Sequence, residues 1–167
     1  MADEKKEPWL NYLALTTVIF AVCATLATFK GGGYSTRSVL SQAQASDQWA
    51  YYQAKSIRRY ESEIARDLFA NMKNEALSEQ YVKNAEKYRK DDEEIQKEAK
   101  ALEDESHFRG RQALRLHFGE VFLEVAIVFA SLAILSKRSG IWYAAIALAL
   151  VGVGIASTML LLAKSAG

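Results

Sequence analysis

The chain has 167 residues, 50% of them hydrophobic, and a formal net charge of +1. These averages are typical of a soluble domain, but they conceal a strong segregation. Most charged residues lie between Lys30 and Arg115, whereas 9–29 and 141–163 carry none. The charged segment between these two uncharged runs has nearly balanced positive and negative charge, which gives no support for a nucleic-acid partner or a polybasic lipid anchor. Because Cys23 is the only cysteine, an intrachain disulfide and a cysteine-based metal cluster are excluded.

Three apolar runs have the length of membrane-spanning helices, which need about 20 residues to cross ~30 Å of hydrocarbon. They predict transmembrane helices at 9–30, 118–136 and 141–163, with an N-terminal tail at 1–8 and a short turn at 137–140. The first run is longer than the core of a typical signal peptide, so we expect it to be retained. The sequence therefore predicts an all-α membrane protein that lies in the lipid bilayer.

The basic residues outside the first and third runs predict the orientation. Lys5 and Lys6 precede the first run, and Lys137 with Arg138 fill the turn before the third. The positive-inside rule places these residues in the cytoplasm. Aromatic residues suited to the membrane interface also open both runs, namely Trp9, Tyr12, Trp142 and Tyr143. We therefore expect a cytoplasmic N-terminus and an extracytoplasmic segment at 35–117.

The segment 35–117 is predicted to form a long antiparallel coiled-coil hairpin between the first two transmembrane helices. Three glycines at 31–33 predict the end or a pivot of the first helix, and Ser35 or Thr36 could cap the next one. The residues 71–74 are predicted to form the turn between two arms of similar length. Gly110 is not expected to break the second arm, which should continue into the membrane. Apolar residues at a seven-residue step predict the contact between the arms: Ala43, Ala50, Ile57 and Ile64 with Val39, Ala54, Tyr60 and Leu68 in the first arm, and Leu77, Tyr81, Tyr88, Ile95 and Leu102 with Ala85 and Ala99 in the second.

Polar residues form a stripe at the start of the second apolar run. His117, Glu120 and Glu124 lie at helical spacing, and Ser131 continues their stripe. Carboxylates in an apolar run are costly unless they are compensated. They could reach the interface or bond to a neighbouring helix, or they could line the axis or pore of an oligomer. A metal would need ligands from symmetry-related copies, so we expect neither a metal nor a cofactor.

Small residues form stripes on two of the predicted transmembrane helices. Such stripes let helix backbones approach each other in lipid, either within one subunit or between subunits. Together with a thin hairpin, they favour a homo-oligomer. The stripes comprise Ala14, Thr17, Ala21, Ala24 and Thr28 in the first helix, and Ala145, Ala149, Gly152 and Ala156 in the third.

An aromatic and basic segment, SDQWAYYQAKSIRRY at 46–60, is a candidate surface for a protein partner. Trp49, Tyr51, Arg58 and Arg59 are its candidate contact residues, although Trp49 could instead cover the second arm. This segment, with PWLNYLALTT before it and two terminal apolar runs after it, resembles a family of bacterial membrane proteins catalogued only as a domain of unknown function. The resemblance implies a location in the bacterial inner membrane and brings no activity with it.

The sequence contains no recognisable catalytic set of nucleophile, base and orienting group, and no phosphate-binding loop. We therefore expect a non-enzymatic, homo-oligomeric inner-membrane protein whose hairpin serves assembly, scaffolding or partner recognition. Two alternatives remain open. One is an ion-conducting or gating oligomer with Glu120 and Glu124 along its axis, and the other is an accessory subunit that binds other membrane proteins.

Overall fold

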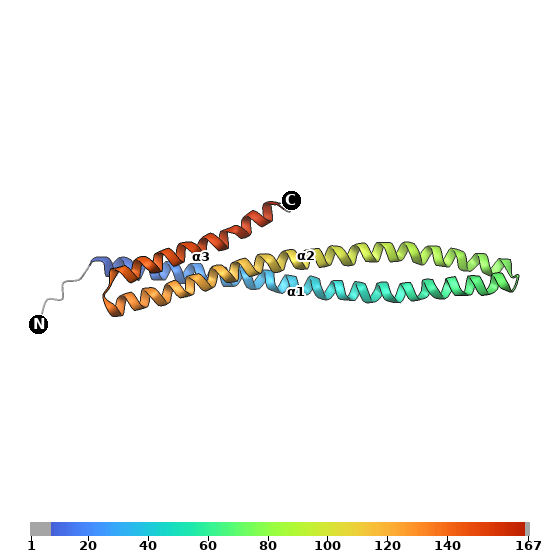
Figure 1. Ribbon diagram of the computed structural model, residues 1–167, viewed down its shortest axis with the longest axis horizontal. Coiled ribbons are helices and arrows are strands. Elements are labelled where there is room, and N and C mark those ends of the chain that lie inside the picture. Colours follow the sequence, from blue (N-terminus) through green and yellow to red (C-terminus); the bar gives the residue numbers. More distant parts are fainter. Residues whose placement is uncertain (1–7, 166–167) are drawn as a thin grey trace, which may run out of the picture. The chain divides into compact units, whose positions relative to one another are not determined.

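A computed structural model describes residues 8–165, with side chains described as far as Met159. Within this range the chain forms three α-helices, α1 (Pro8–Asn71), α2 (Glu75–Ser136) and α3 (Ser139–Ser165), and no strand (Figure 1). Each helix contains a stretch that is long and apolar enough to cross a membrane. The predicted all-α class and three membrane-length helices are thus confirmed. Of the predicted tail at 1–8, only Pro8 lies in the described range.

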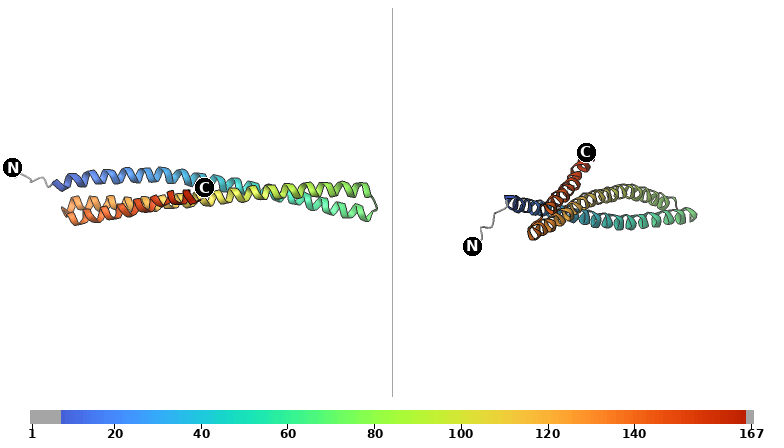
Figure 2. Two further views of the ribbon diagram at one scale, coloured as in Figure 1. Left: turned by 90° about the horizontal axis from the view of Figure 1, so that it is seen from above. Right: turned by 60° about the vertical axis from the view of Figure 1, so that its left-hand side comes forward.

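The chain divides into two compact units that share α1 and α2. The membrane unit comprises the described residues up to Thr36 and from Arg109 onward, and the hairpin unit comprises Arg37–Phe108. In the hairpin unit, α1 and α2 lie side by side as antiparallel arms in all three ribbon views (Figures 1 and 2).

The predicted end of the first helix at 31–33 is wrong, because α1 continues through all three glycines to Asn71. Gly31 is buried, and a Cβ added to it would lie 3.1 Å from Cε1 of His117 on α2. This close packing explains why α1 stays helical here despite the conformational freedom of glycine. Thr36 does not cap a new helix. Its hydroxyl donates to the carbonyl of Gly32 within α1, at 3.0 Å.

The two turns form where the sequence predicts them. Between α1 and α2, Lys73 has a φ of 55°, and the backbone N–H of Asn74 donates to the carbonyl of Phe69 at 2.9 Å. The side chain of Asn74 then caps α2 by accepting from the N–H of Leu77 at 3.2 Å. The second turn is shorter than predicted, because α3 begins at Ser139. It depends on Lys137, whose φ is 51°.

Small residues hold α2 and α3 together in the membrane unit. A Cβ on Gly119 would lie 2.7 Å from the carbonyl oxygen of Gly152, and one on Gly152 would lie 2.7 Å from that of Gly119. The two backbones therefore touch at this crossing. Alanines bury the rest of the contact, namely Ala126, Ala130, Ala133, Ala145 and Ala149. Close packing of small residues is typical of helices that associate in lipid, where apolar burial contributes little.

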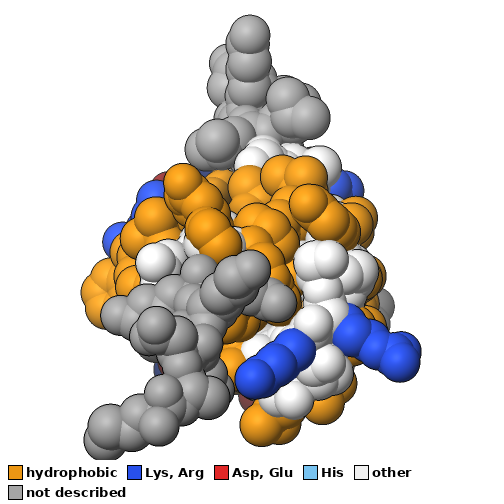
Figure 3. Space-filling model, turned by 90° about the vertical axis from the view of Figure 1, so that its left-hand side faces the viewer, with side chains coloured by type: hydrophobic (Ala, Val, Ile, Leu, Met, Phe, Trp, Pro, Cys, Tyr) orange, Lys and Arg blue, Asp and Glu red, His pale blue; other side chains and the backbone are white. Residues whose placement is uncertain are grey.

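Aromatic side chains join the start of α1 to the start of α3. The rings of Trp9 and Trp142 stack with their centroids 6.3 Å apart, and Nε1 of Trp142 donates to the Thr16 hydroxyl at 3.1 Å. Figure 3 shows hydrophobic side chains covering much of this end of the molecule, with basic side chains beside them. The two aromatic ends thus lie together, as the three-helix arrangement requires.

The predicted apolar contact between the hairpin arms is wrong for α1, whereas on α2 some of the predicted residues are buried. On α2, Ile95 is buried, as are Ala85 and Ala99. On α1, however, Ile57 is 57% exposed and Ile64 is 69% exposed, and the other predicted contact residues (Val39, Ala43, Ala50, Ala54, Tyr60 and Leu68) are exposed as well. Within the hairpin unit, the side chains that α1 buries are small, namely Ser41, Ala45, Ser56 and Ser62.

The crossing of Gly119 and Gly152 predicts a sensitive position. Gly119→Ala places a methyl group against backbone atoms that cannot move without separating α2 from α3. We expect it to lower the stability of the full chain in detergent by about 1–3 kcal/mol, measured by thermal unfolding. Gly154→Ala is the matched control, because its Cβ meets nothing within 4 Å. Equal midpoints for the two variants would contradict the close crossing.

Candidate functional site

The predicted polar stripe divides into a satisfied part and an exposed part. The side chain of Glu120 extends from α2 toward α1, where one carboxylate oxygen accepts a hydrogen bond from the hydroxyl of Thr28. The other oxygen lies 3.1 Å from Nδ1 of His117. The side chain of Glu120 is only 16% exposed. His117 and Glu120 therefore form a polar contact within one chain.

Glu124 and Ser131 lie on the exposed surface of α2. The hydroxyl of Ser131 donates to the carbonyl of Ile127 in its own helix, at 3.0 Å. Within the part of the chain that the structure describes, the carboxylate of Glu124 has no hydrogen bond or ion pair. The residues around it on the same surface are apolar, including Val121, Val125 and Val128. An exposed carboxylate in an apolar run is unfavourable against lipid.

The small-residue stripe of α3 contacts α2 of the same chain. Ala145, Ala149 and Gly152 are buried, and Ala156 is half-buried. The stripe of α1 is mixed: Ala24 is buried and Thr17 is half-buried, whereas Ala14, Ala21 and Thr28 are exposed. The α3 stripe is therefore used within the chain, and part of the α1 stripe remains uncovered.

The aromatic and basic segment is used largely inside the hairpin unit. Nε1 of Trp49 donates to Glu103 on α2 at 3.0 Å, and Arg59 pairs with Asp92 at 3.2 Å. Tyr51 and Arg58 are exposed. The structure thus divides the four predicted contact residues into two that bind the second arm and two that remain accessible.

A buried polar cluster, which the sequence pattern did not identify, joins the arms near their middle. Asp92 is 4% exposed. Its Oδ2 accepts from the hydroxyl of Ser56 at 3.0 Å and lies 3.2 Å from Nε of Arg59. These partners offset part of the cost of burying the charge, while Oδ1 of Asp92 is buried and has no hydrogen-bond partner among the described residues. The sequence feature that could have indicated a polar contact face on α1 is the seven-residue spacing of Tyr52, Arg59 and Arg66.

Lys55 adds an ion pair beside this cluster. Its Nζ donates to Oδ2 of Asp91 at 2.9 Å, which raises the pKa of Lys55 above its ordinary value, and Tyr51 adds to this rise. Because the folded-state pKa is raised, the stabilisation is complete below the ordinary lysine pKa and is lost as the pH rises through the folded value. The pair is therefore intact at neutral pH.

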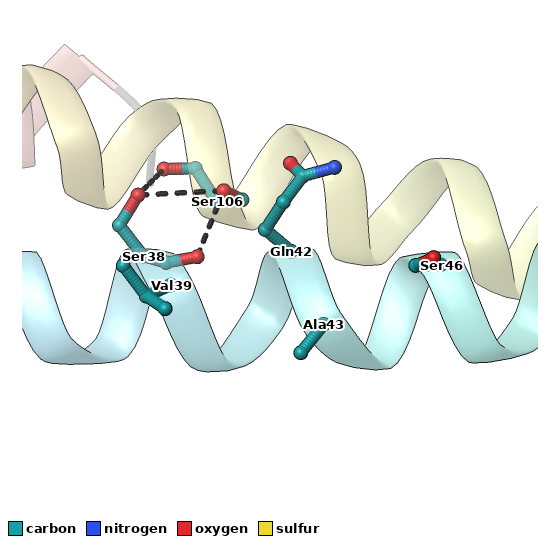
Figure 4. A pocket seen from close by; sticks show the side chains of 6 residues that line it. All are labelled: Ser38, Val39, Gln42, Ala43, Ser46 and Ser106. Carbon is teal, nitrogen blue, oxygen red and sulfur yellow. Dashed lines mark hydrogen bonds between the residues drawn. The ribbon is translucent and has the colours of Figure 1, made fainter.

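A pair of serines extends the polar contact between the arms toward the start of the hairpin unit at Arg37. The Ser38 hydroxyl donates to the carbonyl of Ser106 at 2.8 Å, and the Ser106 hydroxyl donates back to the carbonyl of Ser38 at 2.9 Å. Figure 4 shows Ser38 directed toward α2, whereas Val39 and Ala43 project from α1 away from it. At this place in the hairpin unit, serine hydroxyls thus face the other arm, and Val39 and Ala43 lie on the outer face of α1.

Among the described residues, no group of three or more His, Cys, Asp or Glu side chains is placed to hold a metal ion. These residues supply helix contacts, the exposed carboxylate of Glu124 in an apolar run, and an exposed apolar surface on α1.

Comparison with known proteins identifies a family but no activity. A family model described as "Domain of unknown function (DUF4337)" matches residues 9–162, which is nearly the whole chain. No curated protein and no solved structure matches the chain.

The cluster around Asp92 predicts a weak point for opening of the hairpin. Asp92→Ala leaves Arg59 without its carboxylate and should lower the local opening free energy by about 1–3 kcal/mol. Amide hydrogen exchange of the full chain in lipid nanodiscs measures this as faster exchange in both arms. Glu93→Ala, at an exposed neighbouring position, is the control. If both variants exchange at the wild-type rate, the cluster does not hold the arms together.

Proposed function

We propose that this chain, which belongs to the DUF4337 family, is a non-enzymatic, homo-oligomeric membrane protein whose helical hairpin serves assembly, scaffolding or partner recognition. The proposal concerns the role of the hairpin and the association of copies. Membrane character itself is supported by three helices of sufficient length and apolarity.

The distribution of side chains in the hairpin unit carries the proposal. Its arms meet through polar contacts of serines, Asp92 and Arg59 beside the buried Ala45 and Ile95, while exposed apolar residues follow the opposite face of α1. A two-helix hairpin is too thin to bury a second apolar face by itself. An exposed apolar face of this extent is typical of a surface that contacts another protein.

Glu124 supports the association of copies independently. Its carboxylate is exposed on an apolar stretch of α2 that has the length to span a membrane. Charged residues in such helices usually face a protein interior or a water-filled space. A neighbouring subunit or a polar oligomer axis would provide that environment.

The proposal predicts the size of the particle. The full chain, extracted in mild detergent, should appear by native mass spectrometry as a defined multiple of the single chain, because uncovered apolar and charged surfaces require a neighbour. Dilution over a wide concentration range separates a specific assembly from a chance association in one micelle. A strict monomer at all concentrations would contradict the proposal.

We place the protein in the bacterial inner membrane, with a cytoplasmic N-terminus and an extracytoplasmic hairpin. The family resemblance supports the bacterial membrane, and the basic residues Lys137 and Arg138 at the turn between α2 and α3 support the orientation.

The orientation predicts the side on which the hairpin turn is accessible. In a Cys23→Ala background, Lys73→Cys at the exposed turn should react with a membrane-impermeant maleimide on intact spheroplasts. Ser139→Cys, near the opposite turn, should react only after lysis. The reverse pattern would contradict the proposed orientation.

A further inference from the structure

The exposed apolar residues of α1 form a continuous heptad pattern on its outer face, which we call the outer stripe. Its positions are spaced alternately by three and four residues from 40 to 68. Asp47 and Glu61 occupy two of these positions, and the other seven are apolar: Leu40, Ala43, Ala50, Ala54, Ile57, Ile64 and Leu68. All seven are exposed. The stripe extends for ~42 Å at helical rise.

Alternating spacings of three and four match the surface that a helix presents to another helix in a coiled coil. A globular or extended partner would not require this repeat over eight turns of helix. The arm's own partner, α2, is already engaged on the opposite face of α1 through Ser56 and Ser38. The occupant of the outer stripe is therefore expected to be a helix from outside the chain.

The outer face of α2 does not offer a matching surface. It exposes many charged side chains, including Glu86, Lys87, Lys90, Glu93, Lys97 and Lys100. Within the described hairpin, the exposed surface with an apolar heptad repeat is the outer stripe itself. The surface that matches it is therefore a second outer stripe.

The residues beside the outer stripe also permit self-association. In a parallel pairing these flanking positions set partner choice through their charges. Here most of them are uncharged, namely Val39, Gln44, Ser46, Tyr51, Gln53, Tyr60 and Ala65. Arg58 and Asp67 are the charged exceptions. Two copies of the stripe therefore meet with little repulsion between their edges.

We infer that the outer stripe pairs with the same stripe of a second copy of this chain, in parallel and in register. This inference rests on the proposed function, because it names the partner in the assembly. The parallel direction follows from the continuity of α1 from Pro8 to Asn71. Copies inserted into one membrane in one orientation present this helix in the same direction.

The two acidic positions within the stripe lower the stability of the pair, because in a parallel pair in register Asp47 faces Asp47 and Glu61 faces Glu61 of the second copy. Like charges that face each other across a helix contact repel. Arg58 lies three residues before Glu61, a spacing at which opposite charges on one helix are neighbours, so it compensates Glu61 in part. Asp47 has Gln44 and Tyr51 at the equivalent distances, which offer no positive charge, so Asp47 is the less favourable of the two acidic positions.

Disulfide cross-linking in native membranes tests this pairing. In a Cys23→Ala background, Ala50→Cys and Ile64→Cys are introduced separately into the full chain. Both positions are exposed in the hairpin, so neither replacement disturbs the contact between its arms. Lys97→Cys, exposed on α2, is the control. After mild oxidation, Ala50→Cys and Ile64→Cys should each run mainly at twice the chain mass, and Lys97→Cys should stay mainly single.

The remaining outcomes separate this inference from the proposed function. Because the two cysteine positions are far apart along the helix, self-cross-linking at both requires a parallel, in-register pair, and a product at only one overturns that alignment. A product that contains another protein overturns self-pairing. An oligomer by native mass spectrometry without cross-linking at either position overturns the outer stripe as the interface but leaves the proposed oligomer intact. A strict monomer overturns both.

Discussion

The buried carboxylate of Asp92 fixes which face of α1 turns toward α2. An ionised group removed from water needs polar partners, and Ser56 and Arg59 supply them. Successive residues of a helix are separated by about 100°, so directing Ser56 inward turns Ile57 toward the surface. The serine pair of Ser38 and Ser106 continues the same orientation along the arm. The exposed apolar stripe is therefore a consequence of the polar contact inside the hairpin.

Contacts in the membrane unit follow a different physical rule. Apolar burial contributes little between helices in lipid, so close backbone packing and interhelical hydrogen bonds hold them together. Gly119 and Gly152 provide the first, and the hydrogen bond between Thr28 and Glu120 provides the second. Glu120 thus has a structural role within one chain, whereas Glu124, one turn further along α2, remains exposed. Two carboxylates that look equivalent in the sequence have different environments.

The sequence predicted the features that depend on composition and local propensity. These are the all-α class, three membrane-length helices, the turn at 71–74 and the passage of α2 through Gly110. It did not predict that α1 continues through Gly31, because that depends on the contact with His117 in α2. It also assigned the wrong face of the first arm to the hairpin. Apolar periodicity identifies a face suited to helix pairing, but it does not say which helix pairs with it.

We propose that each hairpin directs Ser56 and Arg59 of α1 toward its own second arm and keeps the apolar outer stripe for a second copy. A cryo-electron microscopy structure of the full chain in lipid nanodiscs would show both contacts. We expect Ser56 against Asp92 inside each hairpin, and Ile57 and Ile64 against the same residues of a neighbouring copy. Ile57 and Ile64 packed against α2 of their own chain, or facing water in an assembled particle, would contradict this proposal.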